Sequence, residues 1–550
     1  MDIIEMLERR DEISYDEVSF KDYFRGRAFG AVLVAVVCLL ILIGALLYTG
    51  LSKDIYFWDS ATYWEISRNI ASSLFDKGFL YEVYNSVTEM DYNYIAAIPS
   101  ALWMRVFGFS RMSYVASLIV IYVIPFVLVI YSMAKKMSKA PYVSFVLTVL
   151  LMPLVLYMAY IGFADAGGML IALLCYNLYY TKTGVTDKKY RYVIIGILLV
   201  LIMVFRRYFA FFSVSFFTAM VADSILYDRK KKNVIITGAV IAFILLALLL
   251  PYVINILLKD YGDLYSGYKY DVMTDLKLIT RYYGLGFLIV TLLTPLISII
   301  TRQEHRPVFA LMQIFVCFIM FISTQSHGQQ HLLMYVPAFA VLIIFLVNCV
   351  NKRWMLLGLC CLSLLNFGSV CINRPQPANI QEIRGMSFFP TFTFAPEKRT
   401  DTQAILALKR ELDAWVPEGA KCAVLASSFV LNDGVIRNVE PSLNLSGGRD
   451  SSYITGLPEV DSRDFWRLNE IYTAEYILVA DPPQTHLAQG EQTITQQAVA
   501  SFNNNSDIAL SFEKAEGFER HIGNIRVNLY KRVKDVDLVQ KTEFELRLYK

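Results

Sequence analysis

The chain has 550 residues, of which 56% are hydrophobic and 18% are charged. Its 51 basic and 48 acidic residues nearly balance, and a net charge of +3 does not favour nucleic acid as a partner. Long apolar runs recur along the first two-thirds of the sequence, which excludes an ordinary soluble protein and indicates a polytopic membrane protein.

The predicted membrane spans follow a mixed-charge N-terminal segment, 1–28. This segment does not have the pattern of a cleavable signal peptide, so we expect the first span to be retained. A span needs about 20 apolar residues. Runs near that length lie at 29–51, 112–133, 141–160, 208–227, 234–258, 283–301, 307–323, 331–348 and 354–371. Shorter runs at 166–180 and 192–205 bring the predicted number of transmembrane helices to about eleven.

Lys and Arg residues gather in every second loop between these runs, and the positive-inside rule then predicts a cytoplasmic N-terminus. The basic loops lie near 25–27, 135–139, 182–191, 229–232, 302–306 and 352–353. An odd number of spans leaves the chain after Cys371 outside. The long first outer loop, 52–111, and a tail at 372–550 are then both extracytoplasmic.

The tail has the pattern of a small soluble α/β domain. It begins with a polar, proline-containing linker, NRPQPANIQEIRG. The segment DTQAILALKRELDAW has helical spacing, whereas KCAVLASSF, AEYILVADPP and NIRVNLYKRV are typical of strands. Seven of the eight cysteines lie in or beside apolar runs, and Cys422 lies in this tail, so we predict no disulfide framework.

The first outer loop opens with FWDSATYWEISRNI at 57–70, where Asp59 is bracketed by Trp58, Tyr63 and Trp64. Segments rich in Trp and Tyr are typical of chains that lie in the headgroup layer. One interpretation makes Asp59 the N-cap of the following helix and the aromatic residues membrane anchors. The other makes Asp59 a reactive carboxylate at the membrane surface.

Arg206 and Arg207 follow a run that is too short to cross the bilayer easily. Residues 192–205 reach about 21 Å as a helix, against roughly 30 Å of hydrocarbon. The pair also falls in a predicted outer turn, against the positive-inside rule. Its side chains either extend to the interface at a helix end or form a buried anion site that opens outward, and we favour the anion site.

Three further polar residues lie at predicted outer helix ends. Asp165 precedes the short run 166–180, and it either faces a wet cavity or caps the next helix. His327 and His331, in STQSHGQQHLLMYVP, are four residues apart, a spacing that on a helix suits a metal or a phosphate. Nothing else in the sequence supports a divalent metal or another cofactor, and the simplest interpretation is a pair of wet interfacial histidines.

Together these features resemble the GT-C superfamily of integral-membrane glycosyltransferases over residues 29–371. The shared features are an N-in first span, an Asp soon after it in a long outer loop, and YNYIAAIPSALWMRVFGFSRMSYVASL leading into the second span. An outer Asp after the third span, an Arg-containing turn after the fifth and a soluble outer tail complete the resemblance.

The resemblance implies transfer of a sugar from a polyprenyl-phosphate carrier to a glycan, lipid or protein acceptor on the outer face of the membrane. It implies Asp59 as the base and Asp165 as a residue that orients the acceptor or the loop. We expect Arg206 and Arg207 to serve the donor phosphate. The other residues assigned to substrate binding are Arg281, His327, His331, Trp58, Tyr63 and Trp64. Asp59 is followed by Ser60, unlike the paired acids of protein O-mannosyltransferases, and Asp165 by Ala166, unlike oligosaccharyltransferases.

Two other kinds of membrane protein remain open at this point. An O-antigen polymerase or ligase also uses lipid-linked sugars, but such enzymes usually have a large late outer loop, whereas here the early loop is long. A transporter or flippase of lipid-linked sugars often shows matched broken helices in two halves, and the sequence shows no such pairing.

Overall fold

The computed structural model describes most of the chain from residue 20 onward. The described residues are 20–76, 78–89, 92–181, 190–227, 232–301, 305–350, 352–374, 383, 385–445, 448–457, 460–464, 467–488 and 490–548. The predicted cytoplasmic segment up to residue 19, most of the predicted linker and parts of the basic loops at 182–191, 229–232 and 302–306 lie outside these residues.

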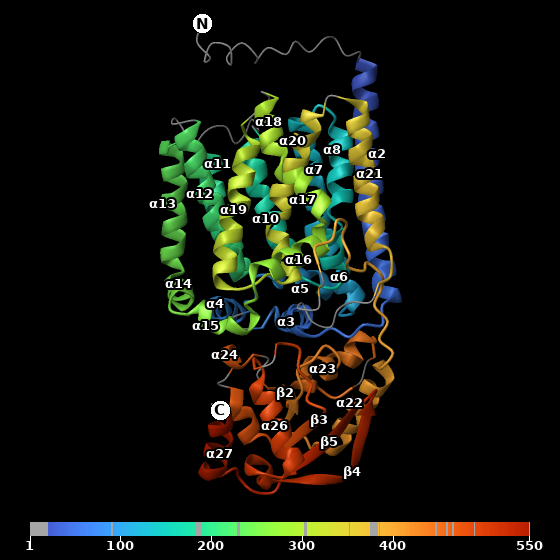
Figure 1. Ribbon diagram of the computed structural model, residues 1–550, viewed down its shortest axis with the longest axis vertical. Helices are drawn as coiled ribbons and strands as arrows, with labels where there is room; N and C mark the ends of the chain where they lie inside the picture. The colour runs from blue at the N-terminus through green and yellow to red at the C-terminus, as the bar shows by residue number, and fades with distance from the viewer. Residues whose placement is uncertain are drawn as a thin grey trace.

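All eleven predicted apolar runs are helical, and apart from the end of the run 234–258 they form one upright bundle (Figure 1). Among the described residues, five helical stretches are long and apolar enough to cross a membrane. They are α2 (Phe20–Leu51), α6 to α7 (Arg111–Met137), η2 with α12 (Arg207–Leu226), α19 (Pro307–Thr324) and α21 (Arg353–Val370). Three shorter apolar helices are α10 (Ala166–Tyr180), α11 (Tyr190–Phe205) and α20 (Val336–Cys349).

The remaining spans are helix pairs that bend at a short break. The bends are 52° between α8 (Pro141–Leu151) and α9 (Pro153–Tyr160) and 88° between α13 (Lys232–Leu248) and α14 (Leu250–Leu257). A third bend, of 93°, separates α16 (Val272–Tyr283) from α17 (Leu285–Leu292) and α18 (Thr294–Ile300). The predicted run 234–258 is therefore not one straight span, because α14 turns away at Leu249.

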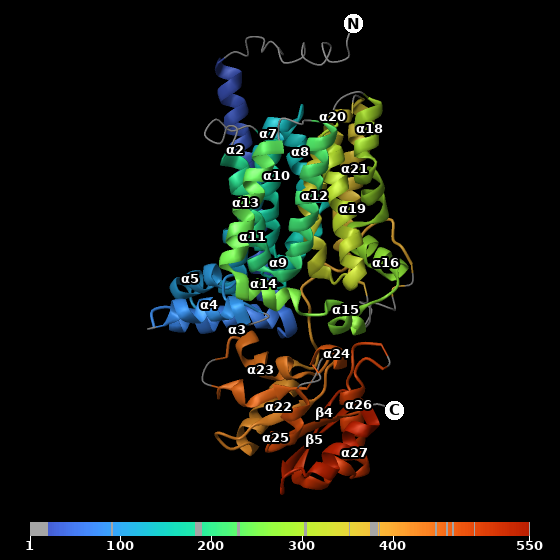
Figure 2. The same cartoon turned by 90° about the vertical axis from the view of Figure 1, so that its left-hand side faces the viewer.

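Short helices lie across one end of the bundle, between it and the C-terminal domain (Figures 1 and 2). They come mainly from the predicted first outer loop: α3 (Trp58–Ser73), α4 (Phe79–Glu89) and α5 (Ile98–Phe107). α14 and α15 (Tyr261–Leu264) lie at the same level. Of the residues that the sequence singled out, this layer carries Trp58, Asp59, Tyr63 and Trp64, all in α3.

The C-terminal domain is built on a five-stranded sheet with the order β2-β1-β3-β5-β4. Strands β1 (Cys422–Leu425), β2 (Ile454–Gly456) and β3 (Tyr476–Asp481) are parallel, whereas β5 (Ile525–Arg532) runs antiparallel to both β3 and β4 (Phe512–Ile522). Val424 and Leu478 face one buried cluster, and Ala423 and Ile477 face the other, as alternation along strands requires.

Helices cover both faces of this sheet. They are α22 (Thr402–Trp415), α23 (Asp433–Ser442), α24 (Asp461–Asp464), α25 (Leu468–Thr473), α26 (Thr493–Asn504) and α27 (Leu538–Leu548). The predicted helix corresponds to α22, and the three predicted strands correspond to β1, β3 and β5, which confirms the predicted α/β domain. Part of the connection to this domain, including the buried Phe392, packs against the transmembrane helices. The predicted boundary at residue 372 stays a prediction.

Candidate functional site

Asp59 lies in the first turn of α3, but it does not cap that helix. The N-cap residue is Phe57, which makes no side-chain cap bond. The Asp59 carboxylate instead accepts hydrogen bonds from the Tyr92 hydroxyl on Oδ1 (2.5 Å) and from Arg206 (3.1 Å) and Gln330 (3.4 Å) on Oδ2. The N-cap interpretation of Asp59 is therefore wrong, because its oxygens point away from the helix backbone.

Arg206 is the centre of this cluster and lies between α11 and η2 (Arg207–Phe209). Its Nε donates to Asp165 Oδ1 (2.8 Å), Nη1 to the Tyr63 hydroxyl (2.9 Å) and Nη2 to Asp59 Oδ2 (3.1 Å). The side chain is only 8% exposed. A buried charge needs an opposite charge beside it, and the Arg206 guanidinium has two carboxylates. Arg206 therefore does not extend to the membrane interface.

Aromatic rings surround the same guanidinium. The Cζ atom of Arg206 lies 4.8 Å from the ring centre of Tyr63, 5.6 Å from that of Tyr92 and 5.4 Å from that of Tyr208. Such cation–π contacts stabilise a partly desolvated cation. They also fix the plane of the guanidinium, and with it the directions of its hydrogen bonds.

Asp165 occupies the N-cap position of α10, yet its side chain does not cap the helix. Oδ1 accepts from Arg206 (2.8 Å) and from the Tyr208 hydroxyl (2.5 Å). Oδ2 is buried without a hydrogen-bond partner within the described part of the chain. The carboxylate thus faces the Arg206 cluster, and the capping interpretation is wrong for Asp165 as well.

Two glycines allow this approach. A Cβ atom on Gly167 would lie 2.3 Å from the Phe205 ring, and one on Gly168 would lie 2.4 Å from the Phe209 ring. The turn 205–209 therefore packs directly onto the first turn of α10 only because both positions lack a side chain. This packing brings Arg206 to Asp165.

The two carboxylates differ in their surroundings. Burial would raise the pKa of the Asp59 carboxyl, but Arg206 and the hydrogen bond from Tyr92 outweigh burial and lower it below its usual value. For Asp165 burial prevails over Arg206 and Tyr208, and the charge of Asp59 adds to it, so the pKa is raised. Asp59 is 20% exposed, whereas Asp165 is completely buried. A substrate can therefore reach Asp59 but not Asp165.

The two predicted histidines have different partners. The ring of His327 lies between Asp275 (3.0 Å from Nδ1) and the Tyr335 hydroxyl (2.7 Å from Nε2), and its backbone N–H also donates to Asp275 (2.7 Å). His331 is in η5 (Gln329–Met334), ahead of α20, and its Nδ1 accepts from the Gly328 N–H (2.8 Å). The i, i+4 spacing does not give a shared helical face, because His327 precedes a 3-10 helix.

His331 is a neutral hydrogen-bond donor at the edge of the cluster. Burial lowers its pKa to about 3, and the neighbouring His327 and Arg206 act in the same direction. Since Nδ1 accepts a hydrogen bond, the proton of the neutral ring is on Nε2. The ring lies 4.7 Å from that of Tyr208, so this donor adjoins the Arg206 cluster.

The other predicted residues lie around the cluster. Arg207 is half-buried, and its charge lies close enough to act on the hydroxyl of Tyr252 in α14. Arg281, at the end of α16, lies over the ring of Tyr282, 5.9 Å from its centre. Trp64 is completely buried in the core of the transmembrane module, so it is neither a headgroup anchor nor a surface on which a sugar can stack.

Trp58 contacts the C-terminal domain. Its ring centre lies 4.3 Å from that of His486 and 5.0 Å from that of Phe429. Tyr63 is buried and binds Arg206. The C-terminal domain covers one side of the half-buried Trp58 ring, and the expected role of Trp58 as a headgroup anchor stays a prediction.

Sequence reasoning missed Tyr92, Tyr208 and Gln330. Tyr208 directly follows the Arg pair, and Gln330 lies between the two histidines, so both were within reach of a closer inspection of those motifs. Tyr92 is 33 residues from Asp59, and no local pattern connects the two.

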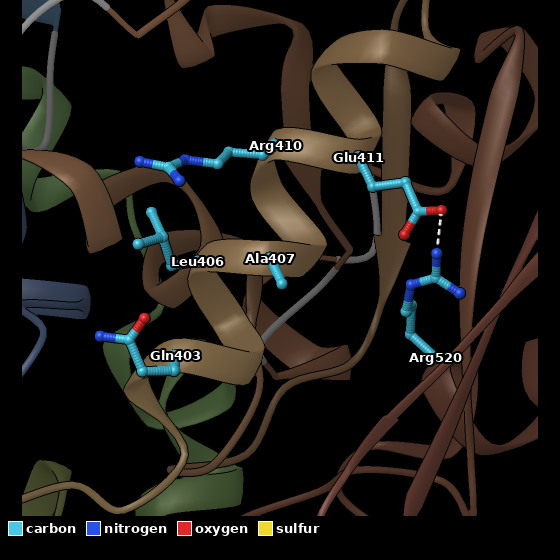
Figure 3. Close-up of a pocket in the computed structure, with 6 residues that line it drawn as sticks. All are labelled: Gln403, Leu406, Ala407, Arg410, Glu411 and Arg520. Atoms are coloured by element: carbon cyan, nitrogen blue, oxygen red, sulfur yellow. Dashed lines mark hydrogen bonds and ion pairs between the residues drawn. The ribbon is translucent and has the colours of Figure 1, made fainter.

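Across the described ranges, no group of three or more His, Cys, Asp or Glu residues is placed to hold a metal ion. Between the Asp59 and Asp165 carboxylates lies the Arg206 guanidinium. A groove of about 430 Å³ on the C-terminal domain shares no residue with this cluster (Figure 3). Its lining residues are Gln403, Leu406, Ala407, Arg410, Glu411 and Arg520.

The bundle, the short helices across its end and the α/β domain define a polytopic membrane protein with a polar site at the junction of its two modules. None of the protein-family models matches this sequence, and comparison with curated protein sequences gives no significant match.

Seven chains of solved structures match this chain, and two of them are crystal structures of ArnT. One is ArnT from Cupriavidus metallidurans in the apo state, with 11% sequence identity and a TM-score of 0.55. The other is ArnT from the same organism bound to undecaprenyl phosphate, with 12% identity and a TM-score of 0.56. Each match covers 92% of this chain and 98% of the ArnT chain. The chain therefore has the GT-C fold that the sequence resemblance predicted for residues 29–371, and the structural match extends over 92% of the chain.

Proposed function

We propose that this protein is an inverting glycosyltransferase that moves a sugar from a polyprenyl-phosphate carrier to an acceptor on the side of the membrane that carries the C-terminal domain. The observation that carries the proposal is the partly exposed Asp59 carboxylate, held by Arg206 and Tyr92 where the bundle meets that domain. The fold shared with ArnT, one of whose structures holds undecaprenyl phosphate, supports a polyprenyl-phosphate donor.

Asp59 is the general base in this proposal. Oδ1 accepts one hydrogen bond, from Tyr92, so it keeps a lone pair for the proton of an acceptor hydroxyl. The acceptor oxygen forms a bond to the anomeric carbon as its proton passes to Asp59. The bond from that carbon to the phosphate oxygen breaks, its electron pair leaves with the phosphate, and the configuration inverts.

The leaving phosphate needs hydrogen-bond donors, and the cluster supplies them. Arg206 has five N–H groups, and three of them donate to Tyr63, Asp59 and Asp165. The two others, together with the Nε2–H of His331, can bind phosphate oxygens as their negative charge grows. Asp165 orients Arg206 and does not touch the substrate.

The test compares Asp59→Asn with Asp165→Asn in purified protein, with a polyprenyl-phosphate sugar in excess and an acceptor extract. The asparagine side chain of the Asp59→Asn variant keeps an oxygen for Tyr92 and Arg206 but cannot take a proton. We expect this variant to bind donor and to lose transfer by roughly 10²–10⁴-fold, the usual effect of losing a general base. Asp165→Asn should show a milder defect in turnover and a lower thermal midpoint, because it weakens a buried ion pair.

Near-normal turnover by Asp59→Asn together with an inactive Asp165→Asn would show that Asp59 is the wrong carboxylate for the base. Movement of lipid-linked sugar across vesicles without transfer by the unmodified protein would favour a transporter or flippase. Mass-resolved comparison of envelope glycans from cells with and without the gene would identify the glycan, lipid or protein that accepts the sugar.

A further inference from the structure

The segment between α2 and Asp59 is incorporated into the C-terminal domain. Ile55 is completely buried and belongs to the hydrophobic core of that domain, with residues of α22, α23 and the sheet. The backbone N–H of Lys53 donates to the Glu397 carbonyl (2.9 Å), and that of Tyr56 donates to the Ser442 hydroxyl (3.2 Å). The chain is thus fixed to the domain just before it reaches Asp59.

The next two residues, Phe57 and Trp58, also contact the C-terminal domain. Phe57 packs so close to Gly434 of α23 that a Cβ atom there would lie 3.3 Å from the Phe57 Cβ. Trp58 has a φ of +48°, a conformation that a bulky residue adopts only when its surroundings impose it. The surroundings are the rings of His486 and Phe429, at 4.3 and 5.0 Å from the Trp58 ring.

The pocket for Trp58 is itself firmly held. His486 Nδ1 lies 2.7 Å from the Ser427 carbonyl, and the buried Gln492 side chain accepts the backbone N–H groups of His486 (2.7 Å) and Leu487 (2.9 Å). Burial lowers the pKa of His486 to about 4, so its ring is neutral near pH 7. The Trp58 indole N–H is buried without a hydrogen-bond partner in the described structure, so shape and not hydrogen bonding holds the ring.

We propose that the C-terminal domain positions the Asp59 carboxylate by holding residues 53–58, and that Trp58 is the positioning residue. Trp58 directly precedes Asp59, so the backbone rotation imposed at Trp58 sets the direction in which α3 presents the carboxylate to Tyr92 and Arg206. The inference rests on the proposed function only where it concerns rate. A displacement of about 1 Å in a catalytic group can lower the rate by up to about 100-fold.

The test uses full-length protein with substitutions on both sides of this contact. Trp58→Ala and Phe429→Ala should each lower kcat at least about tenfold, with the KM for donor changed by less than about twofold. Trp58→Phe should recover most of the loss, because the indole N–H has no hydrogen-bond partner to lose among the described residues. The double variant Trp58→Ala, Phe429→Ala should lose less rate than the two single losses multiplied together, since both remove the contact between the Trp58 and Phe429 rings, while Phe429→Ala also removes the contact of Phe429 with the Phe57 ring (6.1 Å).

Ser462→Ala is the matched control. It removes another contact between the domain and the helices beneath the bundle, the hydrogen bond from the Ser462 hydroxyl to the Leu264 carbonyl (3.2 Å). We expect its kcat to equal that of the unmodified protein. Equal losses in Ser462→Ala and Phe429→Ala would mean that domain docking in general, and not the hold on Trp58, sets the rate, and would overturn the proposal.

Amide hydrogen exchange over residues 58–64 supplies a readout that is independent of activity. Exchange should be faster in Trp58→Ala and Phe429→Ala and unchanged in Trp58→Phe and Ser462→Ala. Unchanged exchange and unchanged kcat in the two alanine variants would disprove the positioning role. Failure of the proposed function would give a different result. Asp59→Asn would then turn over normally, whereas the exchange rates of residues 58–64 would still show whether Trp58 holds this segment in place.

Discussion

One guanidinium donates hydrogen bonds to two carboxylates in this site, and the two carboxylates differ in their exposure to solvent. Arg206 contacts Asp59 and Asp165 at 3.1 and 2.8 Å, yet only Asp59 has an exposed surface. The same cation therefore has two effects. It keeps Asp59 ionised, as a base must be before reaction, and it compensates the burial of Asp165.

The first prediction at this scale separates Arg206 from Arg207. Lysine keeps the charge but has no planar fork, so Arg206→Lys cannot bridge Tyr63 and both carboxylates at once. We expect transfer to drop by tens- to hundreds-fold, which corresponds to the roughly 2–4 kcal/mol lost with one transition-state donor. Arg207→Lys, at a half-buried position that starts η2, should retain most of the rate.

Donor turnover by both purified single variants is the measurement. Equal losses in the two would place Arg207 in the phosphate site beside Arg206. Unchanged rates in both would leave Arg206 with a structural role only.

The second prediction concerns pH. A base works when it is deprotonated, so kcat/KM is high above its pKa and falls below it. The pKa of Asp59 is lowered, and we expect the rate to stay level as pH falls to about 4, near the ordinary value for Asp. Tyr92→Phe removes a hydrogen bond that favours the ionised form, so the acidic limb should move to higher pH. An unmoved limb would show that a group other than Asp59 titrates.

At the candidate site, the sequence could predict residues that stand out against their local surroundings. Asp59, Asp165, Arg206 and His331 are polar residues at predicted helix ends, and the structure places all four in or beside one cluster. Tyr92 could not be found this way, because tyrosines are common in this chain and its contact with Asp59 is long-range.

At the scale of elements, the packing of α10 against η2 decides whether the site forms. The third prediction follows from it: Gly168→Ala should force Phe209 away from α10 and separate Arg206 from Asp165. Overpacking of this kind typically costs about 1–3 kcal/mol, so we expect a lower thermal midpoint in detergent and slower transfer.

Gly358→Ala in α21 is the control, because a Cβ atom there would meet no atom of the described part of the chain within 4 Å. Alanine is favoured over glycine within a helix by about 1 kcal/mol, so that variant should be as stable as the unmodified protein or more stable. A Gly168→Ala protein with normal stability and normal turnover would contradict the packing argument.

The apolar runs predicted which segments become helices but not how the helices are oriented. The run 234–258 is interrupted at Leu249 and continues as α14, where Pro251 lies in the first turn. Proline lacks a backbone N–H and suits a new helix start, so this residue was a signal for the break. Strands β2 and β4 escaped prediction because β2 has three residues and β4 has an irregular burial pattern with few buried positions.

At the scale of the whole molecule, orientation in the membrane is the property that the fold alone does not assign. The fourth prediction is that the C-terminal domain lies outside the cell membrane and the α7–α8 turn inside. Cys422 is unsuitable as a reporter, because it is completely buried in β1 and burial raises the pKa of its thiol to about 12. Glu418→Cys and Lys136→Cys, both at exposed positions, replace it.

The labelling uses a background in which the exposed Cys361 and Cys371 are alanine. A membrane-impermeant thiol reagent should modify Glu418→Cys in intact spheroplasts and Lys136→Cys only after lysis. The reverse pattern would put the C-terminal domain in the cytoplasm and would contradict the positive-inside argument.

The contacts of Ile55 and its neighbours also determine which parts of the protein can fold first during synthesis. The Thr402 hydroxyl contacts the carbonyl of Lys53 across 349 residues of chain, and Ile55 is buried by helices and strands that follow Thr402. At 5–20 residues per second, a ribosome needs roughly 20–70 seconds to make the intervening chain. Throughout that time the segment before Asp59 lacks the core into which it folds. The contacts of Lys53 and Ile55 with the C-terminal domain therefore form only after all the membrane helices have been made.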